Sequence, residues 1–527
     1  MQHDRPESCL RADETGGLLS SVRKGLRGHE TLVSLSLLIV PNVICWLLLF
    51  PGYFQADHQE SIARFLSGEP SLWHSMVWSL LALPLVYATP SYALYGLFQI
   101  ALFVVCAYCS IRRLVRLGIL RGTVLTSALF GLFPSFLLFN ELYSSDVCFA
   151  SLLILLTSMC IEIAETRGGA FRDRGFCVRL ALLCFFVLSL RKNAVLIGVT
   201  LCVVVPLAFR PVWRQALLTF LCSLVVALGL DMSWPVLMGA QPSPSQELLS
   251  VPTLQIAATY AAGGDIPDDA NGYLTSFRSS EDWAATYVPY TADFAKRHVS
   301  LTPEFAKSWL EIGLRNPGIY LSAYAQLEYP FWTLVDTSEN FLSTDFGCNE
   351  HLTHEHLSPG HESYASQFGG EEEKSSLWRK PQSIQSLVNN LRLPVLSDLF
   401  YLVLFNRGLS LWVVLVGLVA SARDKRLGYL VSAIPVACVV LGLLVFAPMP
   451  LARYAMHTYY SLPLLIIYLV RRTSVRVVRQ DSPEDCWSEA AVQESPRGFP
   501  QLRNFAPIAQ SSRAIGLSQK AWGYAPR

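Results

Sequence analysis

The chain has 527 residues, of which 52% are hydrophobic and 15% are charged. Soluble globular proteins carry about 25% charged residues, so this deficit indicates a chain that contacts lipid. The formal net charge of +1 argues against nucleic acid as a partner. Most of the 13 cysteines lie inside apolar runs, which indicates small buried side chains and no disulfide framework. We therefore expect an all-α polytopic membrane protein.

Ten apolar stretches are predicted to cross the bilayer, because a spanning helix needs about 20 mainly apolar residues. They comprise residues 31–50, 91–111, 123–140, 147–163, 176–190, 194–209, 216–238, 398–420, 427–446 and 457–470. The apolar run 76–89 is short and contains Pro84, so we expect a re-entrant or interfacial helix there. Just before it, "SIARFLSG" predicts a short amphipathic helix that lies on the membrane in the first external loop.

Basic residues set the predicted orientation, since cytoplasmic loops carry an excess of Lys and Arg. Arg23, Lys24 and Arg27 precede the first span and place the N-terminus in the cytoplasm. If the run 76–89 does not cross the bilayer, the remaining basic loops all fall on the same side: "RRLVRLGILR", "RGGAFRDRG", "RPVWRQ", "RDKR" and "RRTSVRVVR". Both termini are then cytoplasmic.

The spans divide the chain into five parts, listed here in order. They are a cytoplasmic N-terminal segment (1–30), an N-terminal transmembrane module (31–238), an external domain (239–397), C-terminal transmembrane helices (398–470) and a disordered cytoplasmic tail (471–527). The external domain is expected to be small and mainly helical. Within it, Thr302 is expected to cap a helix that Pro303 opens.

Two carboxylates follow the first span in "QADHQES", where Asp57 and Glu60 are separated by one helical turn. One interpretation is a capping box. In it, the Asp57 carboxylate accepts a hydrogen bond from a backbone amide in the first turn of a helix, and the Glu60 carboxylate accepts one from the backbone amide of Asp57. The other is catalysis, because a carboxylate just outside the bilayer can take a proton from an acceptor hydroxyl. The two interpretations are compatible, since residues at i and i+3 share a helix face.

The next external loop, "FNELYSSDVCF", is very short and brings Glu141 and Asp146 to the same membrane face. Capping of the following span by Ser144, Ser145 or Asp146 would also explain the sequence. Because two separate juxtamembrane loops both supply carboxylates, we regard Glu141 and Asp146 as candidate catalytic residues alongside Asp57 and Glu60.

Cations on the predicted outer side oppose the positive-inside bias. "LSLRKNAVL" places the cations Arg191 and Lys192, followed by Asn193, between two spans. A further cation, Arg453, precedes the last span in "PMPLARYAMHTYY". These side chains could simply extend to lipid headgroups. Alternatively, they form a clamp for a phosphate or pyrophosphate at the outer leaflet, and we assign all four to substrate binding on that basis.

The stretch "HLTHEHLSPGHES" concentrates histidines at 351, 354, 356 and 361 and could bind zinc, but it lacks a helical period and contains Pro and Gly. We interpret it as a flexible polar loop and predict no metal site and no cofactor; a divalent metal is possible but has no support in the sequence. Neither a Walker loop nor a dinucleotide-binding glycine pattern occurs at a credible position.

This arrangement of loops resembles the GT-C class of polytopic glycosyltransferases, such as protein O-mannosyltransferases and lipid A aminoarabinose transferases. Stretches across residues 31–470 are also similar to an uncharacterised bacterial multi-pass family associated with that class. They are "FPGYFQADHQESIARFLSG", "WHSMVWSLL", "LFQIALFV", "LYSSDVCFASLLIL", "LRKNAVLIGV" and "SQELLSVPTLQIA". The resemblance implies a bacterial plasma-membrane enzyme that takes a sugar from a polyprenyl-phosphate donor at the outer face.

By position, Asp57 matches the acidic residue of the first external loop, which in such enzymes acts as base or orients the acceptor. Asp146 or Glu141 matches the acidic position of the second external loop. The chain has Asp57-His58-Gln59-Glu60 where mannosyltransferases have an adjacent Asp-Glu pair. It also lacks the Trp-Trp-Asp motif of oligosaccharyltransferases, which argues against an asparagine acceptor.

The implied reaction is a single displacement in which Asp57 accepts the acceptor's proton and the cations stabilise the leaving phosphate. His74 in "LWHSM" could assist, and Glu247 and Gln255 in "QELLSVPTLQIA" are further substrate-binding candidates. The acceptor would be a glycan, a lipid or a protein. A multi-pass transporter or a flippase for lipid-linked glycans is the alternative, although such proteins usually place ionisable residues near the bilayer midplane.

Overall fold

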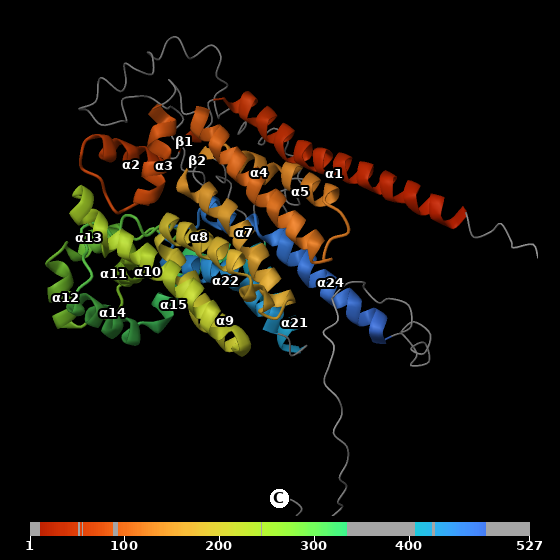
Figure 1. Ribbon diagram of the computed structural model, residues 1–527. Helices are drawn as coiled ribbons and strands as arrows, with labels where there is room; N and C mark the ends of the chain where they lie inside the picture. The colour runs from red at the N-terminus through yellow and green to blue at the C-terminus, as the bar shows by residue number, and fades with distance from the viewer. Residues whose placement is uncertain are drawn as a thin grey trace, which may run out of the picture. The chain divides into compact units, whose positions relative to one another are not determined.

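The structure is a computed structural model that describes residues 11–50, 53–54, 56–87, 93–243, 245–334, 406–423 and 427–480 (Figure 1). The histidine-rich stretch 351–363, the start of the predicted span 398–420 and most of the predicted tail lie outside these residues. The chain divides into two compact units, Met1–Thr473 and Ser474–Arg527, and the site described below belongs to the first.

Helices make up nearly all of the described first unit. Before residue 243 they are α1 (Arg11–Leu49), α2 (Ala56–Leu66), α3 (Met76–Tyr87), α4 (Ala93–Arg116), α5 (Val124–Leu132), α6 (Pro134–Asn140), α7 (Ser145–Glu165), α8 (Arg174–Leu190), α9 (Val195–Ala208) and α10 (Trp213–Met238). After residue 406 they are α21 (Leu409–Arg423), α22 (Leu427–Phe446), α23 (Ala452–Tyr459) and α24 (Leu462–Gln480). The two-residue strands β1 (Tyr53–Phe54) and β2 (Leu142–Tyr143) pair in parallel.

The prediction of an all-α, multi-pass membrane protein is confirmed at this level. Five of the described helices, α1, α4, α7, α10 and α22, contain segments long and apolar enough to cross a membrane. Other predicted spans correspond to shorter helices, such as α8 with 17 residues, α9 with 14 and α21 with 15. The predicted span 123–140 is divided into α5 and α6 at Pro134, because proline lacks the amide proton that would continue the helix. The total of ten spans stays a prediction.

Helix α7 lies at the centre of the bundle and packs against α4, α8, α22 and α23. Its sequence is apolar around its whole circumference, and such a helix is stable only when neighbours surround it. Asp146 in its first turn is therefore held among other helices, at the end of the bundle where α8, α10 and α22 terminate.

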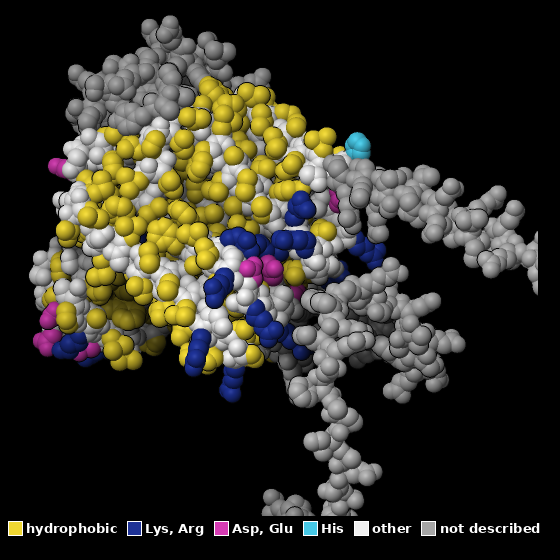
Figure 2. Space-filling view, in the orientation of Figure 1, with side chains coloured by type: hydrophobic (Ala, Val, Ile, Leu, Met, Phe, Trp, Pro, Cys, Tyr) yellow, Lys and Arg dark blue, Asp and Glu magenta, His cyan; other side chains and the backbone are white. Residues whose placement is uncertain are grey.

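Exposed arginines concentrate at the opposite end of these helices, where α4, α7 and α9 end and α5, α8 and α10 begin. They are Arg112, Arg116, Arg121, Arg167, Arg172, Arg174, Arg210 and Arg214. Figure 2 shows a broad hydrophobic surface with Lys and Arg side chains gathered toward one edge of it. The bundle thus has one strongly basic end, and Asp146 lies at the other.

The segment from 245 to 331 forms α11 (Ser250–Ala261), α12 (Asp268–Thr275), α13 (Ser280–Ala285), α14 (Pro303–Arg315) and α15 (Pro317–Glu328), drawn in green in Figure 1. As predicted, Thr302 caps α14 by accepting from the Phe305 amide at 3.1 Å, and Pro303 is the first helical residue. A backbone contact joins this segment to the bundle: the Ala292 amide donates to the Pro448 carbonyl at 2.7 Å. Just before the segment, the Leu72 amide donates to the Gln241 carbonyl at 2.8 Å.

Close packing of α5 against α1 depends on Gly131, because a Cβ there would collide with the backbone carbonyl of Leu37. Gly131→Ala is therefore expected to lower the free energy of unfolding by about 1–3 kcal/mol, the usual cost of overpacking. Thermal unfolding of the purified protein measures this loss. Gly229→Ala in α10 is the matched control, since a Cβ at Gly229 meets nothing within 4 Å. Equal stability of both variants would contradict the close approach of α1 and α5.

Candidate active site

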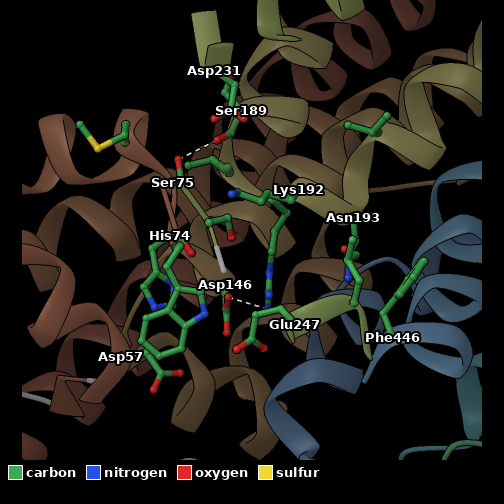
Figure 3. A pocket seen from close by; sticks show the side chains of 18 of the residues that line it. Asp57, His74, Ser75, Asp146, Ser189, Lys192, Asn193, Asp231, Glu247 and Phe446 are labelled. Atoms are coloured by element: carbon green, nitrogen blue, oxygen red, sulfur yellow. Dashed lines mark hydrogen bonds and ion pairs between the residues drawn. The ribbon is translucent and has the colours of Figure 1, made fainter. Parts of the chain in front are cut away.

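A cavity of about 800 Å³ lies where α7 begins and α8, α10 and α22 end. Its polar lining comes from α2, the connection between α2 and α3, the first turn of α7, the short turn η3 (Lys192–Ala194) and α23. The turn η5 (Ser245–Leu249) and the residues before α14 contribute from the other side. Figure 3 shows side chains from several of these elements facing the same space.

Eight of the eleven side chains predicted as catalytic or substrate-binding line this cavity. They are Asp57, His74, Asp146, Arg191, Lys192, Asn193, Glu247 and Arg453. Residues from six separate parts of the chain therefore meet at one place, as a binding or catalytic site requires. Their chemical roles stay predictions.

The most deeply buried charge in the cavity wall is Asp146, whose side chain is 2% exposed. Its Oδ1 lies 2.6 Å from Nη2 of Arg191, the residue at which α8 ends. A carboxylate in the first turn of a helix also interacts favourably with the helix dipole. Capping does not explain Asp146, because Ser144 is the N-cap residue of α7 and makes no side-chain cap hydrogen bond.

His457 completes this buried cluster and was not predicted from the sequence. Its Nε2 accepts from Nη2 of Arg191 at 2.7 Å and lies 3.5 Å from Oδ1 of Asp146. A sequence signal existed, since His457 follows Arg453 at i+4 and such residues share a helix face.

Asp57 forms the second ion pair of the cavity, with Oδ2 2.9 Å from Nη2 of Arg453. The two partners differ in exposure: 33% of the Asp57 side chain is accessible, compared with 7% for Arg453. Arg453 also donates to the Tyr454 hydroxyl at 3.3 Å and lies over the Tyr454 ring. Of the two carboxylates, Asp57 is thus the one that a ligand in the cavity can reach.

Lys192 differs from the two arginines because no described carboxylate lies within ion-pair distance of its ammonium. Asp231 of α10 is the charged residue with the largest electrostatic effect on the Lys192 ammonium. Figure 3 shows Lys192 and Asp231 at the rim of the same pocket, near Ser75 and Ser189. Across the cavity, Lys296 is held between Glu247 at 2.7 Å and Asp293 at 2.8 Å. Lys192 therefore has a positive charge available for an anionic ligand.

Two histidines, His58 and His74, line the cavity together with Asp57. Nε2 of His58 lies 2.7 Å from Oγ of Ser145, and the His58 and His74 rings are 5.0 Å apart. Burial lowers the pKa of His74 to about 4, and its buried Nε2 has no hydrogen-bond partner among the described residues. His74 is thus a neutral ring in the cavity wall.

Another part of the cavity wall is apolar and comes from α8, α10, α22 and the residues that follow α22. Its side chains include Leu188, Leu190, Leu224, Leu228, Leu230, Trp234, Leu443 and Phe446. The cavity therefore combines a charged region with a hydrocarbon-like surface, a combination that fits an amphipathic ligand. Within the described residues, no group of three or more His, Cys, Asp and Glu side chains is arranged to hold a metal ion.

Three predicted site residues, Glu60, Gln255 and Glu141, do not line the cavity. Glu60 is 45% exposed and pairs with Arg64 on the outer face of α2, so it does not share the orientation of Asp57. Gln255 accepts from the Trp309 indole at 2.8 Å and donates to the Tyr320 carbonyl at 3.1 Å, which fixes α11 against α14 and α15.

Glu141 follows α6 and is completely buried behind the cavity wall. Neither carboxyl oxygen has a hydrogen-bond partner among the described residues. Burial raises its pKa to about 9, so the side chain is a neutral acid near pH 7 and does not face the cavity.

Residues 71–483 match a family described as "Family of unknown function (DUF6020)". The match covers more than half of the chain, and the chain belongs to this family. The matched region contains Asp146, Arg191 and Arg453 and begins after Asp57. No curated protein and no solved structure matches the chain. The resemblance to GT-C glycosyltransferases accordingly stays a prediction, and the functional argument depends on the cavity.

The buried acid Glu141 predicts a pH dependence of stability. Its pKa is about 9 in the folded chain and 4.5 ordinarily, so between these values the folded state binds more protons than the unfolded state. Stability then falls as the pH rises through this interval. Glu141→Gln removes the ionisable group and is expected to raise the melting temperature at pH 9 by about 2–4 °C or more.

The gain should shrink to almost nothing near about pH 4, where the acid is protonated in most molecules of both states. Thermal unfolding of the wild type and of Glu141→Gln at several pH values measures it. Glu69→Gln is the control, because Glu69 is exposed. A constant difference across the pH range would contradict a protonated Glu141.

Proposed function

We propose that this member of the family is a membrane glycosyltransferase that moves a sugar from a polyprenyl-phosphate donor to a cell-envelope acceptor. The observation that supports it most is the composition of the cavity. A reachable carboxylate, Asp57, lies in the same 800 Å³ space as Arg191, Lys192 and Arg453, and one wall of that space is apolar. A lipid-linked sugar phosphate has a part to match each of these features.

The donor would place its phosphate near Lys192, whose charge lacks an ion-pair partner among the described residues, and its polyprenyl chain along the apolar wall. Side chains of α10 next to that wall support such an entry route, since Val225, Val226 and Met232 are exposed on the helix surface. In a bilayer these side chains contact lipid, so a lipid tail can pass from the membrane into the cavity without crossing water.

The reaction is a single displacement at the anomeric carbon. Asp57 accepts the proton of the acceptor hydroxyl while the hydroxyl oxygen forms a bond to that carbon. The bond between the carbon and the phosphate oxygen breaks, the phosphate leaves with the electron pair, and the configuration inverts. Lys192, Arg191 and Arg453 stabilise the charge that develops on the phosphate. Positioned proton transfer of this kind contributes about 10²–10⁴-fold to rate.

The charge distribution of the bundle supports an outward-facing cavity. Exposed arginines gather at the end opposite to Asp146, and an excess of Lys and Arg is typical of the cytoplasmic side. Glu30 in α1 accepts from the Thr123 amide at 2.6 Å, which places the N-terminal part of that helix at the arginine-rich end. We therefore propose a bacterial plasma-membrane enzyme with cytoplasmic termini and an external active site, whose acceptor is a glycan, a lipid or a protein.

A transporter or a flippase for lipid-linked glycans is the second candidate, and one observation favours it. Asp231 lies inside the apolar helix α10 and lines the cavity. An ionisable residue within a spanning helix often marks a transport pathway. A transporter needs the cavity for binding only, whereas a glycosyltransferase also needs the Asp57 carboxylate for proton transfer.

Replacement of Asp57 distinguishes the two functions. Asp57→Asn keeps the size of the side chain but removes the base, so transfer should fall about 10²-fold or more. Surface glycans and glycolipids are compared by mass spectrometry in cells that carry the wild type, a deletion, Asp57→Asn or the control Glu60→Gln at equal protein level. Glu60 lies on the same helix and faces away from the cavity.

The deletion and Asp57→Asn are expected to lose the same sugar, while Glu60→Gln keeps it. A glycan that disappears on deletion but persists in Asp57→Asn would contradict the assigned base. No change of any glycan on deletion would contradict sugar transfer itself.

A further inference from the structure

We propose that the phosphate of the donor displaces Asp57 from Arg453, so that donor binding releases the carboxylate that then accepts the acceptor's proton. This inference rests on the proposed function and adds an order to it: the donor binds before the acceptor hydroxyl can be activated. Four features of the cavity support the exchange, and each concerns the two ion pairs and their arginines.

The first feature is the difference between the two carboxylates. Asp146 is 2% exposed and interacts with both Arg191 and His457, so a ligand cannot take its place without leaving a buried negative charge unpaired. Asp57 is 33% exposed at the cavity and can remain solvated when Arg453 binds a phosphate instead. Exchange is therefore favourable at Arg453 and unfavourable at Arg191.

The second feature is the incomplete use of the Arg453 guanidinium. Asp57 binds it through Nη2 at 2.9 Å, while its buried Nε has no hydrogen-bond partner among the described residues. Guanidinium groups bind phosphate in a bidentate manner, with two parallel N–H donors. Asp57 accepts from Nη2 and leaves the Nε donor without a partner among the described residues. A phosphate that contacts Nε and Nη2 together would satisfy both donors.

The third feature is the fixed position of Arg453. Helix α23 is buried from Ala452 to Tyr459 apart from the partly exposed Tyr454. The Arg453 guanidinium also lies 4.9 Å from the centre of the Tyr454 ring, and its Nη2 donates to the Tyr454 hydroxyl. These contacts are independent of Asp57, so Arg453 stays in place when Asp57 leaves.

The fourth feature is the balance of charge around Arg453. Without a ligand, Asp57 neutralises this arginine and is itself held in an ion pair. When a phosphate enters, two anionic groups compete for one guanidinium, and like charges side by side repel each other. The phosphate also gains Lys192, which Asp57 does not contact through an ion pair, and this additional cation favours the phosphate in the competition.

The exchange predicts that Asp57 opposes donor binding. Farnesyl monophosphate is the probe, and its affinity for the purified full chain in lipid nanodiscs is measured through the fluorescence of Trp73 and Trp234, which line the cavity. Asp57→Asn is expected to bind the probe about 3- to 10-fold more tightly than the wild type, the effect of removing one partly exposed competing charge. Arg453→Gln should bind it more weakly than the wild type.

Two matched controls accompany these variants. Glu60→Gln removes a carboxylate from the same helix outside the cavity and should leave the affinity unchanged. Farnesol, which lacks the phosphate, should bind the wild type and Asp57→Asn equally. Thermal unfolding identifies variants that fail to fold. If Asp57→Asn fails to fold, Asp57→Glu takes its place. Because the longer side chain moves the carboxylate relative to Arg453, its affinity for the probe should lie between those expected for the wild type and for Asp57→Asn.

The outcomes separate the inference from the proposed function. Tighter binding of the phosphate probe by Asp57→Asn alone supports the exchange. Binding by the wild type that is unchanged or weakened in Asp57→Asn overturns the exchange and leaves the glycosyltransferase proposal in place. Absence of phosphate-dependent binding by the wild type overturns both.

Discussion

The arrangement of the cavity depends on the buried ion pair between Asp146 and Arg191. A carboxylate that is 2% exposed must have a cation beside it, because an unpaired charge in this environment would strongly destabilise the fold. This requirement brings the start of α7 to the end of α8, and His457 adds α23 to the same point. Once α23 is in place, Arg453 faces Asp57 on α2. The second ion pair is thus a consequence of the packing around the first.

The ion pairs also explain why a chain with few charged residues keeps so many in one place. Within the described part of the first unit, the cavity collects Asp57, Asp146, Arg191, Lys192 and Arg453, and another part of its wall is apolar. Neutralised pairs tolerate the low dielectric of a membrane protein, whereas Lys192 keeps a charge for a ligand. A cavity with this division suits a molecule with an anionic head and a hydrocarbon tail better than a purely polar solute.

Part of this site could be predicted because spanning helices alternate in direction. When the run 76–89 does not cross the bilayer, the loops that contain Asp57, Asp146, Arg191 and Arg453 fall on one side of the bundle, and the structure brings these residues to one cavity. The direction of a side chain on its own helix could not be predicted in the same way. Glu60 turns outward toward Arg64, although it follows Asp57 by only three residues.

Burial and pairing depend on tertiary contacts that no local pattern contains. Glu141 and Asp146 belong to the same short loop, but only Asp146 reaches the cavity, while Glu141 is enclosed near α1 and the start of α24. The role of His457 depends on the packing of α23 against α7, which joins residues about 300 positions apart in the chain. The helical class, the cap at Thr302 and the break at Pro134 required only local chemistry, and of these the class and the cap were predicted.

The central claim is that the cavity holds a lipid-linked phosphate, and photo-crosslinking tests it most directly. A polyprenyl monophosphate with a diazirine in its lipid chain is irradiated with the purified protein, and the labelled peptides are identified by mass spectrometry. The account predicts labels on α10 and α22 beside the cavity, near Leu224, Leu228, Leu443 and Phe446, that unlabelled polyprenyl phosphate removes by competition. Labels spread evenly over exposed apolar side chains such as Val199 and Leu207, without competition, would contradict it.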